Sequence, residues 1–356
     1  MRILTSLFIC CCCLLAKGQN PDSLKLSEYK PVSIYKIPVS HIVHAKYPVI
    51  DFHAHDDEDT DASLEARVKR MDSAGIEKAI ILTYSTGARF DSLIEKYAPF
   101  SNRFELWCGF DYGEKNKPGW EKRAIAELER CYAKGARGVG ELGDKGLGEL
   151  YSLPYPGYGI HIDDPAMKPL LTRCGELKMP VSIHVAEDQW MYENQDATND
   201  GLMNAYTWKV DMQVKGKLGH DELIHTLEQA VKENPHTIFI ACHLANSNAN
   251  LGVLGRLFDT YPNLYADIAA RYGEFAPIPR VAKSFFEKYA DRIVYGTDMG
   301  TESAMYQATF RILESADDHF YLPRFFNYHW PLYGLSLSEA TLEKIYHQNG
   351  VRILTR

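Results

Sequence analysis

The sequence lacks a surplus of basic side chains. Its 356 residues include 39 lysines and arginines against 47 aspartates and glutamates, which gives a formal net charge of −8. Nucleic-acid-binding proteins usually carry a basic patch or stripe, so this balance disfavours a nucleic-acid partner. The chain also shows no internal repeat and no low-complexity tract, which argues against a repeat array.

Long apolar runs are also scarce. The clearest one, Ile3 to Leu15, follows an early arginine and precedes Ala16-Lys17-Gly18, which places small residues at both cleavage-determining positions. This pattern is typical of a cleaved export signal over residues 1–18, and the run is too short for a comfortable membrane span. We therefore expect a periplasmic or secreted protein with no membrane contact after removal of the signal.

Cysteines are few outside that signal. Four of the eight lie at positions 10–13, and the others are Cys108, Cys131, Cys174 and Cys242. Four widely spaced cysteines in a chain of this size make no disulfide framework, so we interpret them mostly as core residues. A lipid anchor is disfavoured because bulky residues precede Cys10.

A regular alternation of short β-rich runs and amphipathic helical segments begins at residue 48, after a polar, proline-punctuated leader over 19–47. Helical segments include 121–135, 164–179 and 221–235. The β-rich runs are 48–55, 78–84, 104–111, 136–142, 180–187, 237–245, 264–270 and 292–298. Strand followed by helix, eight times, predicts an α/β fold, a parallel (β/α)8 TIM barrel over residues 48–356. An open doubly wound sheet is the alternative, but HAHDDED stands where that fold often has a glycine-rich phosphate loop.

Two connections are longer than a barrel needs, 143–163 after strand four and 188–219 after strand five. The second carries Trp190 and Tyr192. Connections that follow strands lie at the catalytic face of a barrel, so both loops are expected to bind substrate, with these two aromatic residues as contacts. A decorated surface or a subunit contact is the alternative, and the sequence leaves open whether the protein is a homo-oligomer.

Side chains that suit a metal ion end several of the predicted strands. His53 and His55 alternate along the first strand, so their imidazoles lie on one face. Later strand ends add four more residues: Glu141, His184, His243 and Asp298. In a parallel barrel all these ends meet at one rim, and imidazoles that converge with carboxylates indicate a metal site.

The acids directly after His55 have a different expected role. Asp56, Asp57, Glu58 and Asp59 precede a helix-like segment. Acids in front of a helix are stabilised by its dipole and can cap its free amides. We expect them to begin the next helix.

The motifs HAH, SIHVAE around His184, IACHLA around His243 and YGTDMG around Asp298 together resemble the amidohydrolase superfamily, in its amidohydrolase-related branch, amidohydrolase 2. The resemblance extends over roughly residues 48–350 and includes PNLYADIAAR and EKIYHQN. It implies a metal-dependent barrel enzyme, commonly with zinc or manganese. Its members hydrolyse amide, ester or lactone bonds, or decarboxylate aromatic and related acids.

Carried onto this chain, the resemblance assigns a first metal to His53, His55, His184 and Asp298, with zinc expected and manganese as the alternative. Zinc lowers the pKa of a bound water to about 7, so hydroxide would be the nucleophile. Asp298 would orient it and move its proton. His243 would hydrogen-bond the water or the polarised substrate oxygen.

Three further residues each have two interpretations. Some relatives bridge two metals from the end of strand four. If Glu141 does so, His184 and His243 bind a second ion; otherwise it is a substrate-side or neighbouring carboxylate.

Glu187 resembles the acid of the H-x-x-E pattern in deaminase members, which protonates the substrate, and an ordinary loop carboxylate is the alternative. Arg271 would clamp a substrate carboxylate or form a structural ion pair.

The sequence thus predicts a metal-dependent hydrolase that acts on a small molecule, with one or two divalent ions. A non-oxidative decarboxylase in the same barrel is the alternative enzyme. A barrel that binds a ligand without catalysis is the alternative of another class, disfavoured because every expected ligand is a competent residue type.

Overall fold

A computed structural model of the chain describes residues 19–56, 61–326 and 328–356. The predicted export signal at 1–18 and the acids at 57–59 lie outside the described residues. Asp56 is described, and its carboxylate binds Lys96 and Tyr97 of helix α2 (Gly87–Tyr97) at 2.7 and 2.8 Å. Its side chain therefore contacts α2.

Within the described residues, a strand occurs at each of the eight predicted places. The strands are β1 (Val49–Ala54), β2 (Ile76–Leu82), β3 (Phe104–Trp107), β4 (Val139–Asp144), β5 (Val181–Val185), β6 (Phe239–Ala241), β7 (Leu264–Asp267) and β8 (Ile293–Val294). Every neighbouring pair is parallel, in the orders β1-β2-β3 and β4-β5-β6-β7-β8.

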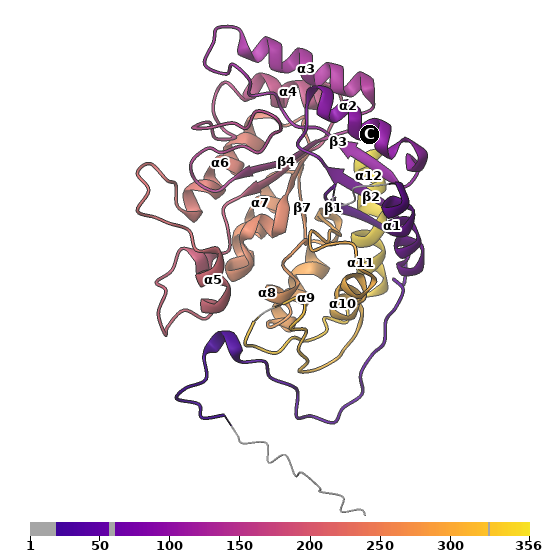
Figure 1. Ribbon diagram of the computed structural model, residues 1–356, viewed down its shortest axis with the longest axis vertical. Helices are drawn as coiled ribbons and strands as arrows, with labels where there is room; N and C mark the ends of the chain where they lie inside the picture. Colours follow the sequence, from indigo (N-terminus) through magenta and orange to yellow (C-terminus); the bar gives the residue numbers. More distant parts are fainter. Residues whose placement is uncertain (1–18, 57–60, 327) are drawn as a thin grey trace, which may run out of the picture.

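Two contacts join these two sheets into a ring. A parallel bridge between Cys108 and Val139 connects β3 to β4. On the other side, the backbone amide of Phe52 donates to the carbonyl of Tyr295 at 2.9 Å, which connects β1 to β8. The fold is therefore the predicted α/β barrel, with helices outside the strands (Figure 1).

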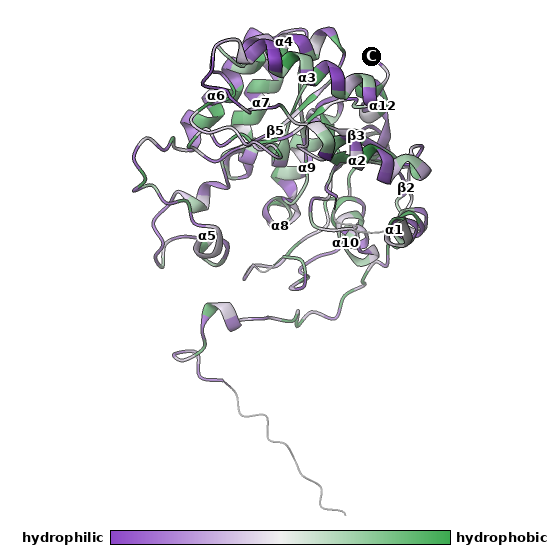
Figure 2. Cartoon of the chain, turned by 45° about the horizontal axis from the view of Figure 1, so that its top comes forward, coloured by the Kyte–Doolittle hydropathy of each residue, from purple (hydrophilic) through white to green (hydrophobic). Residues whose placement is uncertain are grey.

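The helices follow the strands in the predicted alternation, and the segments at 121–135, 164–179 and 221–235 correspond to α3, α4 and α6. The remaining helices with their bounds are α1 (Asp61–Ala74), α3 (Trp120–Lys134), α4 (Lys168–Glu176), α5 (Leu202–Trp208), α6 (His220–Glu233), α7 (Leu251–Thr260), α8 (Tyr272–Phe275), α9 (Pro279–Lys288), α10 (Ser303–Glu314), α11 (Glu339–Glu343) and α12 (Asn349–Leu354). Figure 2 shows apolar residues on the strands and polar residues on outward helix faces. Among the described residues, no helix is long and apolar enough to cross a membrane.

A compact apolar cluster fills the barrel below the rim. Alternate residues of the strands supply it, with Ile353 of α12 from the other end: Ile50, Phe52, Ile80, Leu82, Trp107, Ile238, Ile240, Tyr265, Val294 and Ile353. The pairing of β1 with β2 shifts between Asp51 and Ala54. Such irregularities often re-aim side chains next to active sites, and here Phe52 joins the cluster while its neighbour His53 faces the rim.

The third strand and the last three end earlier than predicted. In particular, the predicted strand 237–245 ends at Ala241, because His243, Leu244 and Ala245 have φ values of 60°, 54° and 54°. This left-handed conformation is uncommon for residues other than glycine and cannot continue a strand. The chain therefore turns at His243, which stands at the rim.

Three long connections lie above the strands, one more than predicted. The loops after β4 and β5 are present, and the second contains α5. The third, 315–338, follows α10 and meets the second where the rings of Trp190 and Trp330 lie 5.5 Å apart. The leader runs past this third connection, to which Ser40 is tied by a 3.0 Å hydrogen bond to Asp317 (Figure 1).

Candidate metal centre

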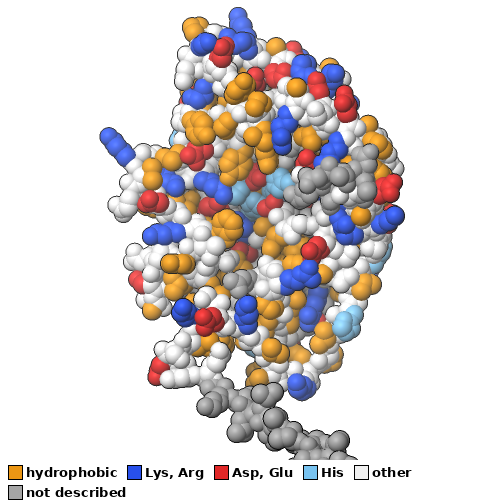
Figure 3. Space-filling model, viewed as in Figure 1, with side chains coloured by type: hydrophobic (Ala, Val, Ile, Leu, Met, Phe, Trp, Pro, Cys, Tyr) orange, Lys and Arg blue, Asp and Glu red, His pale blue; other side chains and the backbone are white. Residues whose placement is uncertain are grey.

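The six predicted rim residues converge. Figure 3 shows imidazoles (pale blue) among carboxylates (red) near the middle of the face that it presents. His53 and His55 lie with ring centroids 5.3 Å apart, as expected from their alternation on β1. His243 packs 4.8 Å from His53 and 4.6 Å from His184.

Asp298 faces the histidine pair of β1. Its Oδ1 lies 3.1 Å from His55 Nε2 and 3.5 Å from His53 Nε2, while Oδ2 lies 3.7 Å from His243 Nε2. Asp298 has φ 55°, and its amide donates to the carbonyl of His53 at 2.9 Å. Strained backbone of this kind concentrates at functional sites.

Glu141 lies between two pairs of histidines. Its Oε2 is 3.8 Å from His53 Nε2 and 3.7 Å from His55 Nε2. Its Oε1 is 2.8 Å from His184 Nδ1 and 3.6 Å from His243 Nε2. Each oxygen of one buried carboxylate therefore serves a different pair.

Hydrogen bonds outside the cluster fix which ring nitrogen faces inward. His55 Nδ1 lies 3.1 Å from the carbonyl of Leu82, and His243 Nδ1 lies 2.8 Å from the carbonyl of Ala269. A carbonyl only accepts, so Nδ1 carries the hydrogen in both rings and the Nε2 lone pair faces the cluster. This is how metal-binding histidines are usually held.

Asp267 is a functional residue that sequence reasoning missed. Fully buried at the end of β7, it binds His53 Nδ1 at 2.9 Å through Oδ2, while Oδ1 accepts from the amides of His243 and Ala269. It therefore orients two histidines of the centre. The signal was a lone acid at the end of an apolar strand, in LYAD, at the level of the other rim residues.

Asp51 was missed as well. Its carboxylate accepts from the amides of His53 and Thr297 and from the Thr297 hydroxyl, at 3.1, 3.0 and 2.6 Å. These bonds tie the start of the His53–His55 segment to the residue before Asp298. Burial raises the pKa of Asp51 to about 6, despite the opposing hydrogen bonds.

The electrostatics of the centre keep its carboxylates ionised. Burial acts against the charged form of Glu141, but its contacts with His184 and His243 hold its pKa well below the usual range. Burial also opposes protonation of His184, yet Glu141 and Glu187 outweigh it and raise the pKa of His184 to about 9. A cation that enters the cluster would therefore meet anionic oxygens and displace protons from imidazoles.

The predicted substrate contacts lie around this centre. Glu187 is buried, with Oε2 3.7 Å from His184 Nε2, so it is no ordinary surface carboxylate. Tyr192 accepts a 3.2 Å hydrogen bond from the Glu187 amide through its hydroxyl. Trp190 stands further out, against Trp330.

Arg271 lies in a buried ion pair, and its role as a clamp for a substrate carboxylate stays a prediction. Its guanidinium is buried, with Nε 2.9 Å from Asn246 Oδ1 and 3.2 Å from Asp188 Oδ2. Another guanidinium nitrogen, Nη1, donates to the carbonyl of Ala270 at 3.1 Å. With these partners, Arg271 braces the loop after β5 against β7.

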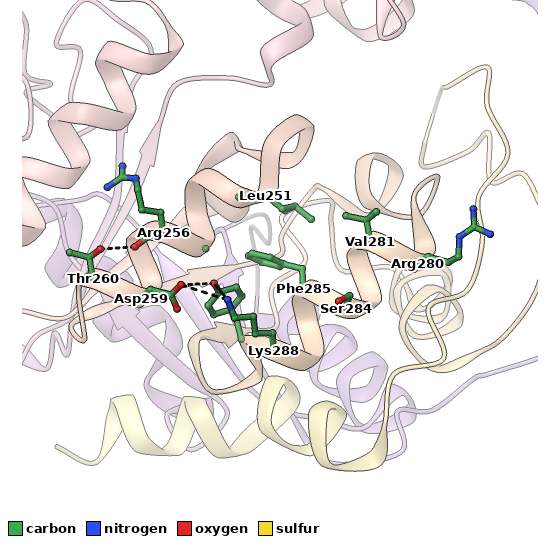
Figure 4. Close-up of a pocket in the computed structure, with 12 residues that line it drawn as sticks. Leu251, Arg256, Asp259, Thr260, Arg280, Val281, Ser284, Phe285 and Lys288 are labelled. Atoms are coloured by element: carbon green, nitrogen blue, oxygen red, sulfur yellow. Dashed lines mark hydrogen bonds and ion pairs between the residues drawn. The ribbon is translucent and has the colours of Figure 1, made fainter.

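A separate groove of about 750 Å³ lies on the outside of the barrel between α7 and α9 (Figure 4). Apolar side chains such as Leu251, Val281 and Phe285 line it. Its charged residues include Asp259, which pairs with Lys288 at 3.6 Å. None of the metal-binding side chains described above lines this groove.

Most of the chain matches the profile of one protein family. The profile of the family described as amidohydrolase matches residues 45–356. The chain belongs to the amidohydrolase family. A comparison with curated proteins found no match.

Solved structures similar to this amidohydrolase share its fold. 2,6-Dihydroxybenzoate decarboxylase from Rhizobium aligns with a TM-score of 0.52 at 18% identity, over 87% of this chain and 99% of that one. A dihydroxybenzoic acid decarboxylase from Polaromonas sp. JS666, with bound manganese and the inhibitor 2-nitroresorcinol, gives 0.54 at 16%, over 87% and 97%. An uncharacterised TIM-barrel protein from Bordetella bronchiseptica gives 0.53 at 17%, over 86% and 98%.

Family membership confirms several predictions. The chain is an enzyme of the amidohydrolase family on a TIM barrel, and it has a site for a divalent metal ion. Among the described residues, three groups of side chains place one ligand atom each within 4.8 Å of one another: His53, His55 and Asp298; His53, Glu141 and His243; and His53, Cys242 and Asp267.

Proposed function

We propose that this protein is a hydrolase that uses two divalent metal ions to cleave an amide, ester or lactone bond of a small molecule. The observation that carries the proposal is the division of Glu141 between His53 and His55 on one side and His184 and His243 on the other. A carboxylate with each oxygen directed to a different pair is suited to bridge two ions.

The residues fit the ions. Ligand atoms that bind zinc at about 2.1 Å in a tetrahedron lie about 3.4 Å from one another. The distances from His53 Nε2 and His55 Nε2 to Glu141 and Asp298 run from 3.1 to 3.8 Å. In addition, His53 Nε2 and His184 Nε2 are buried without a hydrogen-bond partner among the described residues. His53, His55 and Asp298 would hold one ion. His243 and the free Nε2 of His184 would hold the other, with Glu141 shared by the two sites and hydrogen-bonded to His184 Nδ1.

When bound, the ions would polarise the bond to be cleaved and lower the pKa of water. Asp298, which has one oxygen toward His55 and the other toward His243, is placed to accept the proton of an attacking water and pass it to the leaving group. Glu187, buried beside His184, is placed to hold a polar atom of the substrate. Zinc and manganese both suit nitrogen and carboxylate ligands, and we propose zinc for the imidazole-rich set.

Metal content per chain tests the proposal. Protein purified without chelator should contain two ions, and Glu141→Gln should reduce this to one by elemental analysis. Glu149→Gln, in the connection after β4 but outside the centre, is the matched control and should keep two. One ion in both wild type and Glu141→Gln would replace the two-metal site by a mononuclear one. No ion after reconstitution would refute a metal-dependent reaction.

A second candidate is a non-oxidative decarboxylase, which is favoured by the names of two of the similar structures. The same metal-binding side chains would then orient a carboxylic acid, and a proton would be delivered to carbon. Incubation with hydroxybenzoic acids and detection of carbon dioxide separates the candidates. A product that has gained only water supports hydrolysis.

A further inference from the structure

Lys145 lies at the edge of the metal centre, directly after β4. Its ammonium forms an ion pair with Glu187 Oε1, and the other oxygen of Glu187 lies 3.7 Å from His184 Nε2. Lys145 also lies beside the phenol of Tyr151. Its side chain is 37% exposed against 10% for Glu187, so it is the part of this chain of contacts that solvent and ligands can reach.

The backbone on both sides of Lys145 is fixed. Asp144, fully buried, accepts from the amides of Gly146 and Gly148 at 2.9 and 3.1 Å and binds His161 Nδ1 at 2.6 Å. Gly146 and Gly148 have φ values of 116° and 67°. Glycine adopts such positive angles without the steric cost that a side chain would bring. This tight turn presents Lys145 at a defined position, unlike a lysine on a mobile surface loop.

Tyr151 forms a wall beside the ammonium. Its ring lies so close to Gly143 that a methyl group at that position would overlap it. Tyr84 stands next to it, with ring centroids 6.4 Å apart, and lies 5.9 Å from the ring of His55. A ligand between the metal centre and this wall would therefore meet two aromatic rings and one cation.

The charge of the surroundings defines the ligand group. An ammonium has three hydrogen-bond donors, and Glu187 and Tyr151 take two of them at most. The other cation beside Glu187 is Arg271, whose Nη2 lies 3.9 Å from Glu187 Oε2 and whose guanidinium also binds Asn246, Asp188 and the Ala270 carbonyl. A single ammonium already balanced in part by Glu187 suits a singly charged carboxylate better than a phosphate.

We propose that Lys145 binds a carboxylate of the substrate, with the adjoining carbon skeleton against Tyr151 and Tyr84. The inference rests on the proposed function, because it places this carboxylate beside the metal centre. It makes Lys145 the residue of the rim that determines specificity for an anionic substrate.

Matched pairs of acid and amide test the proposal, with benzoate and benzamide, and acetate and acetamide, as probes. Binding to the full-length, metal-loaded protein is measured by calorimetry for wild type, Lys145→Met and Lys145→Arg. Loss of a charge-assisted hydrogen bond should weaken acid binding about tenfold to a hundredfold in Lys145→Met, with amide binding unchanged. Lys145→Arg should recover part of the loss. Lys215→Met, on the exposed loop after β5, is the matched control and should bind as wild type.

Equal loss of acid and amide binding in Lys145→Met, or no loss of either, would overturn the proposal. So would a failure of every acid in the panel to bind wild type at millimolar concentration. Repetition with metal-free protein separates this result from the proposed function. If metal content fails the two-ion test but Lys145→Met still selectively loses acid binding, the hydrolase proposal fails and the carboxylate site stands.

Discussion

The metal-binding side chains at the strand ends, here called the floor of the site, and the loop residues above them, here called its outer edge, are held in different ways. On the floor, His55 and His243 are held by backbone carbonyls, and His53 by the buried Asp267. At the outer edge, Lys145 and Glu187 form an ion pair between two different loops. Backbone carbonyls and the fully buried Asp267 are fixed by the barrel itself, whereas the partly exposed Lys145 can exchange its partner for a ligand. Under the proposed function, the difference assigns the chemistry to the barrel and the choice of substrate to the loops.

The largest expected effect comes from the floor. Asp298→Asn keeps the shape of the side chain but removes its negative charge and its capacity to accept a proton from water. Turnover should fall about a thousandfold, in the range of a lost acid-base group, with the fold preserved by circular dichroism. An unchanged rate would show that Asp298 takes no part in the reaction, and the chemistry could then not be assigned to this residue of the floor.

An intermediate effect is expected one layer behind the floor. Asp267→Asn replaces the anion that binds His53 Nδ1 with a neutral amide, so His53 loses the group that orients it and strengthens it as a ligand. Metal affinity, measured by competition with a chelator, should fall about tenfold to a hundredfold. Asp259→Asn, in the groove between α7 and α9, is the control. Equal affinity in both variants would show that Asp267 does not support the site.

The smallest effect is expected at the outer edge, for His161 in the connection after β4. The hydrogen bond to Asp144 outweighs partial burial and raises the pKa of His161. The folded state therefore favours the charged ring, so its stabilisation is complete below the unfolded pKa, about 6.5, and is lost as pH rises through the higher folded value. His161→Gln should lower the free energy of unfolding by about 1 kcal/mol or less near pH 6 and have little effect near pH 9.

Urea unfolding of wild type and His161→Gln at both pH values measures this difference. His236→Gln, at an exposed position, serves as the control. A loss of stability in His161→Gln that is the same at pH 6 and pH 9 would mean that His161 holds the loop by packing rather than by charge.

Much of the fold could be read from the sequence because strands and helices repeat a local pattern. The order of the eight strands and the convergence of His53, His55 and Asp298 follow from alternation and from the parallel barrel. The end of β6 was predicted too late, because the left-handed turn at His243 depends on the hydrogen bond from its backbone amide to Asp267. The connection that carries Trp330 was missed, since its aromatic residues have no helical or strand period.

The sequence by itself determined the barrel, the family and the set of metal-binding residue types, because local periodicity and strand-end position are written in neighbouring residues. Only the tertiary structure decided how those residues divide. The separation of Glu141 between two histidine pairs, the support of His53 by an aspartate 214 residues away, and the pairing of Lys145 with Glu187 all arise between distant segments. Such contacts depend on side-chain direction and burial, which no local pattern records.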